Sequence, residues 1–262
     1  KIGQNIKFDF IVFYKCGITL SSMEDTMLMS YVLDAGKNRH NMDTLSEIHL
    51  GHKTISFKDM VGTGKKEINF SEVELDKAKD YAAEDADVTF RLYKKFIKNL
   101  KSEKMINIYE IFEKPLIKIL AFMEIEGVEI DSKFLKSLSS KFEKKIQKLE
   151  KEVFKISKKE FNIASPKQLG EIIYNDLKIA GLKKTKKGSF ATSASVLEDL
   201  AFKGHEFPKL ILDWRQVSKL KNTYSDALPE HLNPNTKRVH TSFLLAATTT
   251  GNRNDVPIGH GA

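Results

Sequence analysis

The chain has 262 residues, 41% of them hydrophobic, so it can bury one sizeable core or two modest ones and is not disordered as a whole. Its 43 Lys and Arg against 35 Asp and Glu give a net charge of +8, which favours a polyanionic partner without identifying it. No apolar run approaches the ~18 residues of a membrane-spanning helix. A single cysteine cannot form an internal disulfide, which favours a reducing compartment, the cytoplasm.

The first hundred residues predict a mixture of strand and helix. Residues 2–14 read as a strand that enters a helix or a strand-like apolar run, and Asp9 is expected at the end of the strand-like segment. Apolar residues at helical spacing then recur at 25–33, 44–50 and 72–100. We place a domain boundary near residue 103, after the last of these helices.

The rest of the chain predicts mainly helix. Residues 106–126 form a helix that ends at Gly127, and residues 132–160 form one long amphipathic helix. The polar positions of the long helix hold ten lysines against four glutamates, which is either a solvated face or a surface for phosphates. Further helices are expected at 196–202 and 207–228, and a strand at 238–244.

A basic loop and its flanks add to the positive charge of this part. The loop contains Lys183, Lys184, Lys186 and Lys187, and Ser193 follows in a hydroxyl-rich stretch that begins a helix. Such a tip suits contacts with phosphate groups.

Three residues could form a hydrolytic site. Tyr81 and Asp85 stand at i and i+4 of a predicted helix, so the phenol and the carboxylate share one face, and Asp9 supplies a second carboxylate. Hydrolysis of a phosphodiester benefits from two divalent cations about 4 Å apart, and hard cations prefer carboxylate oxygens. On spacing alone, the simpler interpretation is that Asp9 ends a strand, Tyr81 packs in the core, and Asp85 and Asp87 lie on an exposed helix face.

Two strings favour the hydrolytic interpretation. Residues 3–9, GQNIKFD, and 81–87, YAAEDAD, resemble the second and third motifs of DnaQ-like proofreading exonucleases. Over residues 1–251 the chain resembles bacterial family A DNA polymerases, with further landmarks at 25–28, 39–45, 53–57, 127–131, 161–169, 219–224 and 238–243. The resemblance implies an α/β, ribonuclease H-like exonuclease domain, incomplete at its N-terminus, over 1–103. It implies a mainly helical thumb and the beginning of a palm over 104–251, and residues 252–262 form a divergent tail.

The resemblance also implies a role for individual residues. Asp9 and Asp85 would ligate two divalent cations, Mg²⁺, Mn²⁺ or Zn²⁺, and Tyr81 would orient the attacking water. Asn5, Phe8, Arg39 and Phe57 would hold a single-stranded 3′ end, and His240 would lie near that cleft. Duplex DNA would be held by the 183–187 lysines, Ser193, Arg215 and Lys219. The implied partners are a single-stranded 3′ end and a primer–template duplex, bound by a monomer.

Catalytic completeness is not expected of these residues alone. The first exonuclease motif of the family, Asp-x-Glu, would lie upstream of Lys1, and the catalytic palm would lie downstream. We therefore expect DNA binding with little or no catalysis from residues 1–262. The alternatives are a non-catalytic DNA-binding module and a stand-alone exonuclease of the ribonuclease D type, and residues 128–243 argue against the second.

Overall fold

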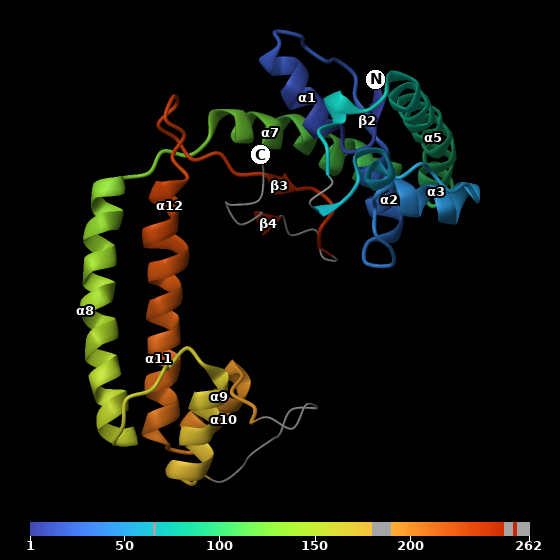
Figure 1. The fold of residues 1–262 in the computed structure, drawn as a ribbon. Helices are drawn as coiled ribbons and strands as arrows, with labels where there is room; N and C mark the ends of the chain where they lie inside the picture. Colours follow the sequence, from blue (N-terminus) through green and yellow to red (C-terminus); the bar gives the residue numbers. More distant parts are fainter. Residues whose placement is uncertain (65–66, 180–189, 249–253, 256–262) are drawn as a thin grey trace. The chain divides into compact units, whose positions relative to one another are not determined.

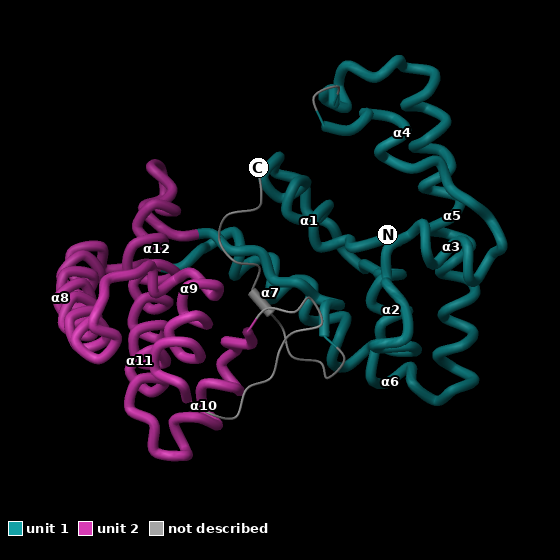
Figure 2. The backbone as a smooth tube through the Cα atoms, turned by 60° about the horizontal axis from the view of Figure 1, so that its bottom comes forward, with its two compact units in different colours: residues 1–128, 240–262 teal, residues 129–239 magenta. Residues whose placement is uncertain are grey.

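The chain leaves its first structural unit at residue 128 and returns to it at residue 240. In the computed structural model, which describes residues 1–64, 67–179, 190–248 and 254–255, unit 1 comprises residues 1–128 and 240–262, and unit 2 comprises residues 129–239 (Figure 2). The expected boundary near residue 103 falls inside unit 1, and a functional division there stays a prediction. Within the described ranges, no helix is long and apolar enough to cross a membrane.

Unit 1 is mainly helical, with short strands (Figure 1). Its elements are β1 (Ile2–Gly3), α1 (Ile6–Lys15), β2 (Glu24–Asp25), α2 (Thr26–Asp34), α3 (Met42–Leu50), α4 (Phe57–Val61), the 3₁₀ turn η2 (Phe70–Glu72), α5 (Leu75–Ser102), α6 (Ile106–Ile108), the π-helical turn η3 (Tyr109–Glu113), α7 (Lys114–Glu126), β3 (Phe243–Leu244) and β4 (Asn254–Asp255). β1 pairs parallel with β2, and β3 pairs antiparallel with β4.

The core of unit 1 gathers side chains from distant parts of the sequence. Phe10 of α1, Leu28 of α2 and Phe96 of α5 are buried in one cluster with Ile117 of α7. Leu245, in the segment that returns from unit 2, is buried in the same cluster. The predicted helical spacing of 25–33 and 72–100 is confirmed, because these apolar residues form the inner faces of α2 and α5.

The strand at the start of the chain is limited to Ile2–Gly3, and the apolar run that follows, expected as a helix or a strand-like segment, forms helix α1. The expected position of Asp9 at the end of a strand is wrong, because Asp9 lies on α1. The helix starts where Asn5 adopts φ 60°, a left-handed conformation that asparagine tolerates better than most residues. The side chain of Asp25 then accepts hydrogen bonds from the N–H groups of Asn5 and Ile6, both at 3.0 Å. The helix is therefore capped by a residue that is distant in the sequence.

Unit 2 is built from helices alone within its described residues. These are α8 (Ser132–Ser157), α9 (Pro166–Glu171), the π-helical turn η4 (Ile172–Asp176), α10 (Ala194–Phe202), α11 (Glu206–Leu220), the π-helical turn η5 (Lys221–Asp226) and α12 (Ala227–Glu230). The long helix α8 runs beside α11, as Figures 1 and 2 both show. It buries Ile146, Leu149 and Val153 against the core of unit 2, so its predicted amphipathic character is confirmed.

The region at the end of unit 2 departs from the prediction. The expected strand over 238–244 reduces to Phe243–Leu244 and an isolated bridge between Val239 and Leu232. The bridge closes a short turn at 233–237, in which the Asn233 side chain accepts the backbone N–H of Asn235 at 2.9 Å.

Candidate active site

Two carboxylates that are far apart in the sequence line the same open pocket of unit 1. The pocket has a volume of about 680 Å³ and is lined by residues 1–4, Asp9, Met42, Asp85, Ala86, Thr89 and Phe90. These residues come from β1, α1, α3 and α5. The structure thus brings together Asp9 and Asp85, which the sequence singled out as metal ligands.

Asp85, which lines this pocket, has one buried carboxylate oxygen. Its Oδ1 atom is buried and has no hydrogen-bond partner among the residues that the structure describes. Burial raises the pKa of Asp85, and the nearby charges of Glu84 and Asp43 raise it further, whereas the Tyr81 phenol lowers it. A buried carboxylate oxygen without a donor is costly unless a cation neutralises it.

Asp9 stands at the rim of the pocket, in the first turn of α1. Its side chain is exposed, yet the surrounding residues desolvate the carboxylate enough to raise its pKa, against the effect of a hydrogen bond from its own backbone N–H. The two acids therefore share both a pocket and a preference for a neutralising partner.

The donor set suits a hard divalent cation but is incomplete. Carboxylate oxygens are the ligands that Mg²⁺ and Mn²⁺ prefer. No group of three or more His, Cys, Asp or Glu side chains with metal-binding geometry occurs in the described part of the chain. The chemistry of the two acids fits a divalent cation, which would need further ligands besides them.

Tyr81 belongs to an aromatic cluster beside Asp85. The ring of Tyr81 lies 6.3 Å from Phe57 and 5.9 Å from Phe70, and the Phe57 and Phe70 rings stack at 5.8 Å. Phe57 is 50% exposed and Phe70 is 37% exposed, so both can meet a ligand. Burial, followed by the charge of Asp85, raises the pKa of Tyr81 to about 12, so the phenol keeps its proton at neutral pH and can donate it.

Glu84 fixes the loop that leads to this cluster. It accepts hydrogen bonds from Nε2 of His52 at 2.7 Å and from the backbone N–H of Ile55 at 2.6 Å. The bond from Ile55 is the main reason that the pKa of Glu84 is lowered. Neither Glu84 nor Phe70 was identified from the sequence, because the residues that they contact, such as His52 and Phe57, are not close to them in the sequence.

Asp25 organises the start of two helices at the base of the site. Its side chain is fully buried, and burial raises its pKa to about 6 despite four opposing hydrogen bonds. The four donors, at 2.9 to 3.4 Å, are the backbone N–H groups of Asn5, Ile6, Met27 and Leu28. One carboxylate therefore caps both α1 and α2.

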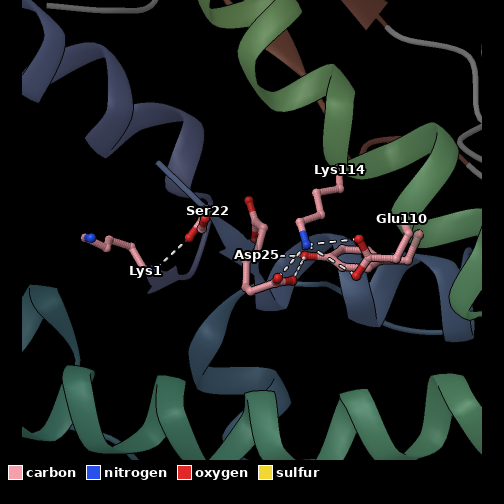
Figure 3. A network of polar contacts seen from close by, with 7 residues as sticks. Lys1, Ser22, Asp25, Glu110 and Lys114 are labelled. Atoms are coloured by element: carbon pink, nitrogen blue, oxygen red, sulfur yellow. Dashed lines mark hydrogen bonds and ion pairs between the residues drawn. The ribbon is translucent and has the colours of Figure 1, made fainter. Parts of the chain in front are cut away.

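The backbone of Asp25 is held from the π-helical turn η3. The Tyr109 hydroxyl accepts the Asp25 N–H at 2.9 Å and donates to Glu24 at 2.9 Å. Lys114 links Glu24, at 2.5 Å, to Glu110, at 3.0 Å, and Figure 3 shows Lys114 between Asp25 and Glu110. This network joins β2 to the start of α7.

The other expected contacts with a DNA end have mixed surroundings. Asn5 precedes α1 and Phe8 lies in its first turn; both are exposed, Phe8 to 66%, and Arg39 is exposed after α2. His240 is anchored, because its Nδ1 atom lies 2.8 Å from the backbone carbonyl oxygen of Glu124 and must donate to it. Their roles in DNA binding stay predictions.

The expected duplex contacts of unit 2 lie in several surroundings. Lys183, Lys184, Lys186 and Lys187 fall outside the described residues. The Ser193 hydroxyl lies 3.1 Å from that of Ser195. Arg215 is half-buried and donates from Nη1 to the Thr192 carbonyl oxygen at 2.7 Å, which is a structural contact, while Lys219 is exposed.

Comparisons with known proteins give matches in both parts of the chain. Residues 1–101 match the family model of a 3′–5′ exonuclease, and residues 132–254 match that of DNA polymerase family A. The chain is 49% identical over 251 residues to DNA polymerase I of Rhizobium leguminosarum, covering 96% of the chain and 25% of that protein. It is 40% identical to DNA polymerase I of Pseudomonas aeruginosa, covering 96% of the chain and 28% of that protein.

A solved structure shares the fold. It is described as the POL domain of Pol1 from M. smegmatis in complex with DNA primer-template and dNTP, and the similarity has a TM-score of 0.79 at 24% identity. The match covers 97% of this chain and 41% of that one. The expected fold class is confirmed, and the match through residues 132–254 does not support a stand-alone nuclease of the ribonuclease D type. The chain spans about a quarter of the length of these curated relatives.

Proposed function

Because the chain belongs to the family A DNA polymerases, as a segment of a DNA polymerase I, we propose that it carries part of a proofreading exonuclease site and a DNA-holding thumb. The observation that carries the exonuclease assignment is the pocket shared by Asp9 and Asp85, where the buried Oδ1 atom of Asp85 has no hydrogen-bond partner within the described part of the chain. In the whole protein the activity would be templated DNA synthesis with 3′ to 5′ proofreading.

Asp9 and Asp85 would hold divalent cations, Mg²⁺ or Mn²⁺ in preference to Zn²⁺ because all the donors are carboxylate oxygens. Bound cations would supply an activated water and charge neutralisation at the leaving oxygen. Tyr81 would orient that water, since its raised pKa keeps the phenolic proton in place. Two further carboxylates would come from the Asp-x-Glu motif of the longer protein, so residues 1–262 alone would show little or no turnover.

The single-stranded 3′ end would lie against the exposed aromatic rings. Stacking of bases on aromatic side chains tolerates any sequence, as removal of any mispaired nucleotide requires. Phe57 and Phe8 are exposed enough to stack, and Phe70 supports the Phe57 ring. Arg39 and Asn5 would contact the sugar–phosphate backbone.

Unit 2 would hold duplex DNA through its backbone. The lysine-rich polar face of α8 and the basic 183–187 segment provide charge without sequence readout. The structural neighbour is described as bound to a primer-template, which supports the same partner for this chain. A cytoplasmic, monomeric protein is the simplest setting for this activity.

A binding experiment tests the exonuclease assignment. We expect weak Mn²⁺ binding by the 262-residue chain, measured by isothermal titration calorimetry, and a loss of at least about tenfold in affinity for Asp85→Asn and for Asp9→Asn. Asp87→Asn is the matched control, because Asp87 is exposed on the same helix, pairs with Arg91 at 3.4 Å and removes the same charge. Equal affinities for Asp85→Asn and Asp87→Asn would refute the assignment.

A further inference from the structure

An ion pair lies inside unit 1, behind the helix that carries Asp9. Lys7 of α1 and Glu124 of α7 bond directly, and their side chains are only 7% and 8% exposed. Removal of two charges from water costs several kcal/mol per ion, so such a pair is weak as a source of stability. In some proteins, buried polar or charged groups of this kind select one geometry among similar packings.

Glu124 is itself held on two sides. Its Oε1 atom also accepts the backbone N–H of Phe243 at 2.6 Å, and its carbonyl oxygen accepts the Nδ1–H of His240 at 2.8 Å. Both contacts come from the segment that returns to unit 1 after residue 239. Glu124 is therefore a fixed point that Lys7 can bind, and not a mobile surface acid.

Lys7 and Asp9 project from opposite sides of α1. Two residues correspond to about 200° around a helix with 3.6 residues per turn. Lys7 lies on the inner side with Ile6 and Phe10, while Asp9 lines the pocket. The apolar contacts on the inner side, such as the Phe10 ring at 5.6 Å from Phe122, are non-directional and allow small rotations of the helix. The ion pair between Lys7 and Glu124 restricts these rotations.

We propose that Lys7 and Glu124 are positioning residues for the Asp9 carboxylate, which fix the rotation of α1 so that Asp9 faces Asp85 across the pocket. This inference rests on the proposed metal site at Asp9 and Asp85. It also gives the returning segment a role, because Phe243 and His240 hold Glu124 in the position that Lys7 requires.

The test is a double-mutant cycle in the 262-residue chain, with Mn²⁺ affinity as the readout. Lys7→Met removes the charge and keeps most of the side-chain volume, and we expect it to weaken Mn²⁺ binding by about 10- to 100-fold, the range seen for groups that orient a ligand. Lys7→Arg keeps a cation and should restore binding to within about threefold of wild type. In an Asp9→Asn background, Lys7→Met should have no further effect, because the residue that it positions is already lost.

Two results would overturn the proposal. Lys7→Met could leave Mn²⁺ affinity unchanged, or it could lower affinity equally in the Asp9→Asn background, which would indicate a general loosening of the fold. If Lys7→Met does not fold, judged by circular dichroism, Glu124→Gln replaces it, since the amide keeps an acceptor for the Phe243 N–H.

The metal site and the positioning role of Lys7 can be tested separately. If wild-type chain binds no Mn²⁺ that depends on Asp9 and Asp85, the metal site is wrong, and hydrogen exchange of residues 6–15 then decides the positioning role. Exchange that accelerates in Lys7→Met but not in Lys7→Arg supports the fixed helix, whereas unchanged exchange in Lys7→Met overturns it.

Discussion

Asp25 gives the sharpest prediction about the fold, because one carboxylate caps two helices of unit 1. We consider Asp25→Ala, which removes all four hydrogen bonds to backbone N–H groups, and Asp25→Asn, which keeps one acceptor oxygen. At pH 8, above the raised pKa of Asp25, the wild-type carboxylate is ionised and accepts all four bonds.

The expected loss in the free energy of unfolding follows from the number of helix caps that the substitution removes. Loss of one N-cap costs about 1 kcal/mol, with a range of about 0.5 to 2 kcal/mol. Two caps in a fully buried site, with N–H groups left unsatisfied, give an expected loss of about 2–4 kcal/mol in the free energy of unfolding for Asp25→Ala. Asp25→Asn should lie between Asp25→Ala and wild type.

The assay separates the two units. Urea unfolding followed by circular dichroism reports the whole chain, while the fluorescence of Trp214, the single tryptophan, reports unit 2. Hydrogen exchange should become faster at the amides of Ile6, Met27 and Leu28. Asp131→Ala is the control, because Asp131 is an exposed residue that caps α8 of unit 2 by a single bond to the Phe134 N–H at 2.9 Å.

Asp131→Ala should lower the free energy of unfolding by about 1 kcal/mol and shift the urea transition that Trp214 fluorescence reports. Asp25→Ala should leave hydrogen exchange in α8 unchanged. The reasoning would be refuted if Asp25→Ala lost no more stability than Asp131→Ala, or if exchange accelerated in only one of the two helices α1 and α2.

Three further predictions concern the candidate site and its support. Phe57→Ala should weaken binding of a single-stranded oligonucleotide by about 1–3 kcal/mol, the usual value of one stacked base, and Phe70→Ala should weaken it less. Equal binding by wild type and both variants in fluorescence anisotropy would contradict the stacking role. Glu84→Ala should cost about 1–3 kcal/mol in urea unfolding, because it leaves the Ile55 N–H without its acceptor, and Glu84→Gln should recover part of this loss. Burial lowers the pKa of His40 in the folded state, so on acidification the unfolded chain binds the proton first. The free energy of unfolding should therefore fall as the pH drops below about 6.5, and this fall should be smaller in His40→Gln. Identical pH profiles for the two proteins would contradict this role of His40.

The long helices could be predicted from the sequence because their signal is local. Residues 132–160 carry apolar residues at steps of three and four, and α8 spans Ser132–Ser157. The same periodicity identified α5, which carries Tyr81 and Asp85 on one face. Gly127 was expected to end a helix, and it follows α7 with φ 70°.

Helix α1 could not be predicted in the same way. Its sequence, IKFDFIVFYK, is rich in β-branched and aromatic residues that favour strands. The helix forms because Asp25, about twenty residues later, caps its first turn, and because Phe10 packs against α7. Neither the cap by Asp25 nor the packing of Phe10 on α7 can be recognised from the sequence of residues 6–15 alone.

In the candidate site, too, the motif residues could be predicted and their long-range partners could not. The motif residues Asp9 and Asp85 were identified from the sequence, and they share a pocket. The groups that support them were missed, because Glu84 bonds to His52 across 32 residues and Lys7 bonds to Glu124 across 117. Such pairs leave no spacing pattern that a single sequence could reveal.

The return of the chain at residue 240 has a consequence for biosynthesis. Leu245 is buried in the core of unit 1, and Phe243 packs against that core, yet both are translated after the whole of unit 2. At about 5–20 residues per second, a ribosome needs on the order of ten seconds to pass from Val128 to Leu245. During that interval Phe243 and Leu245 are not yet available, so the complete core of unit 1 can form only after unit 2 has been synthesised.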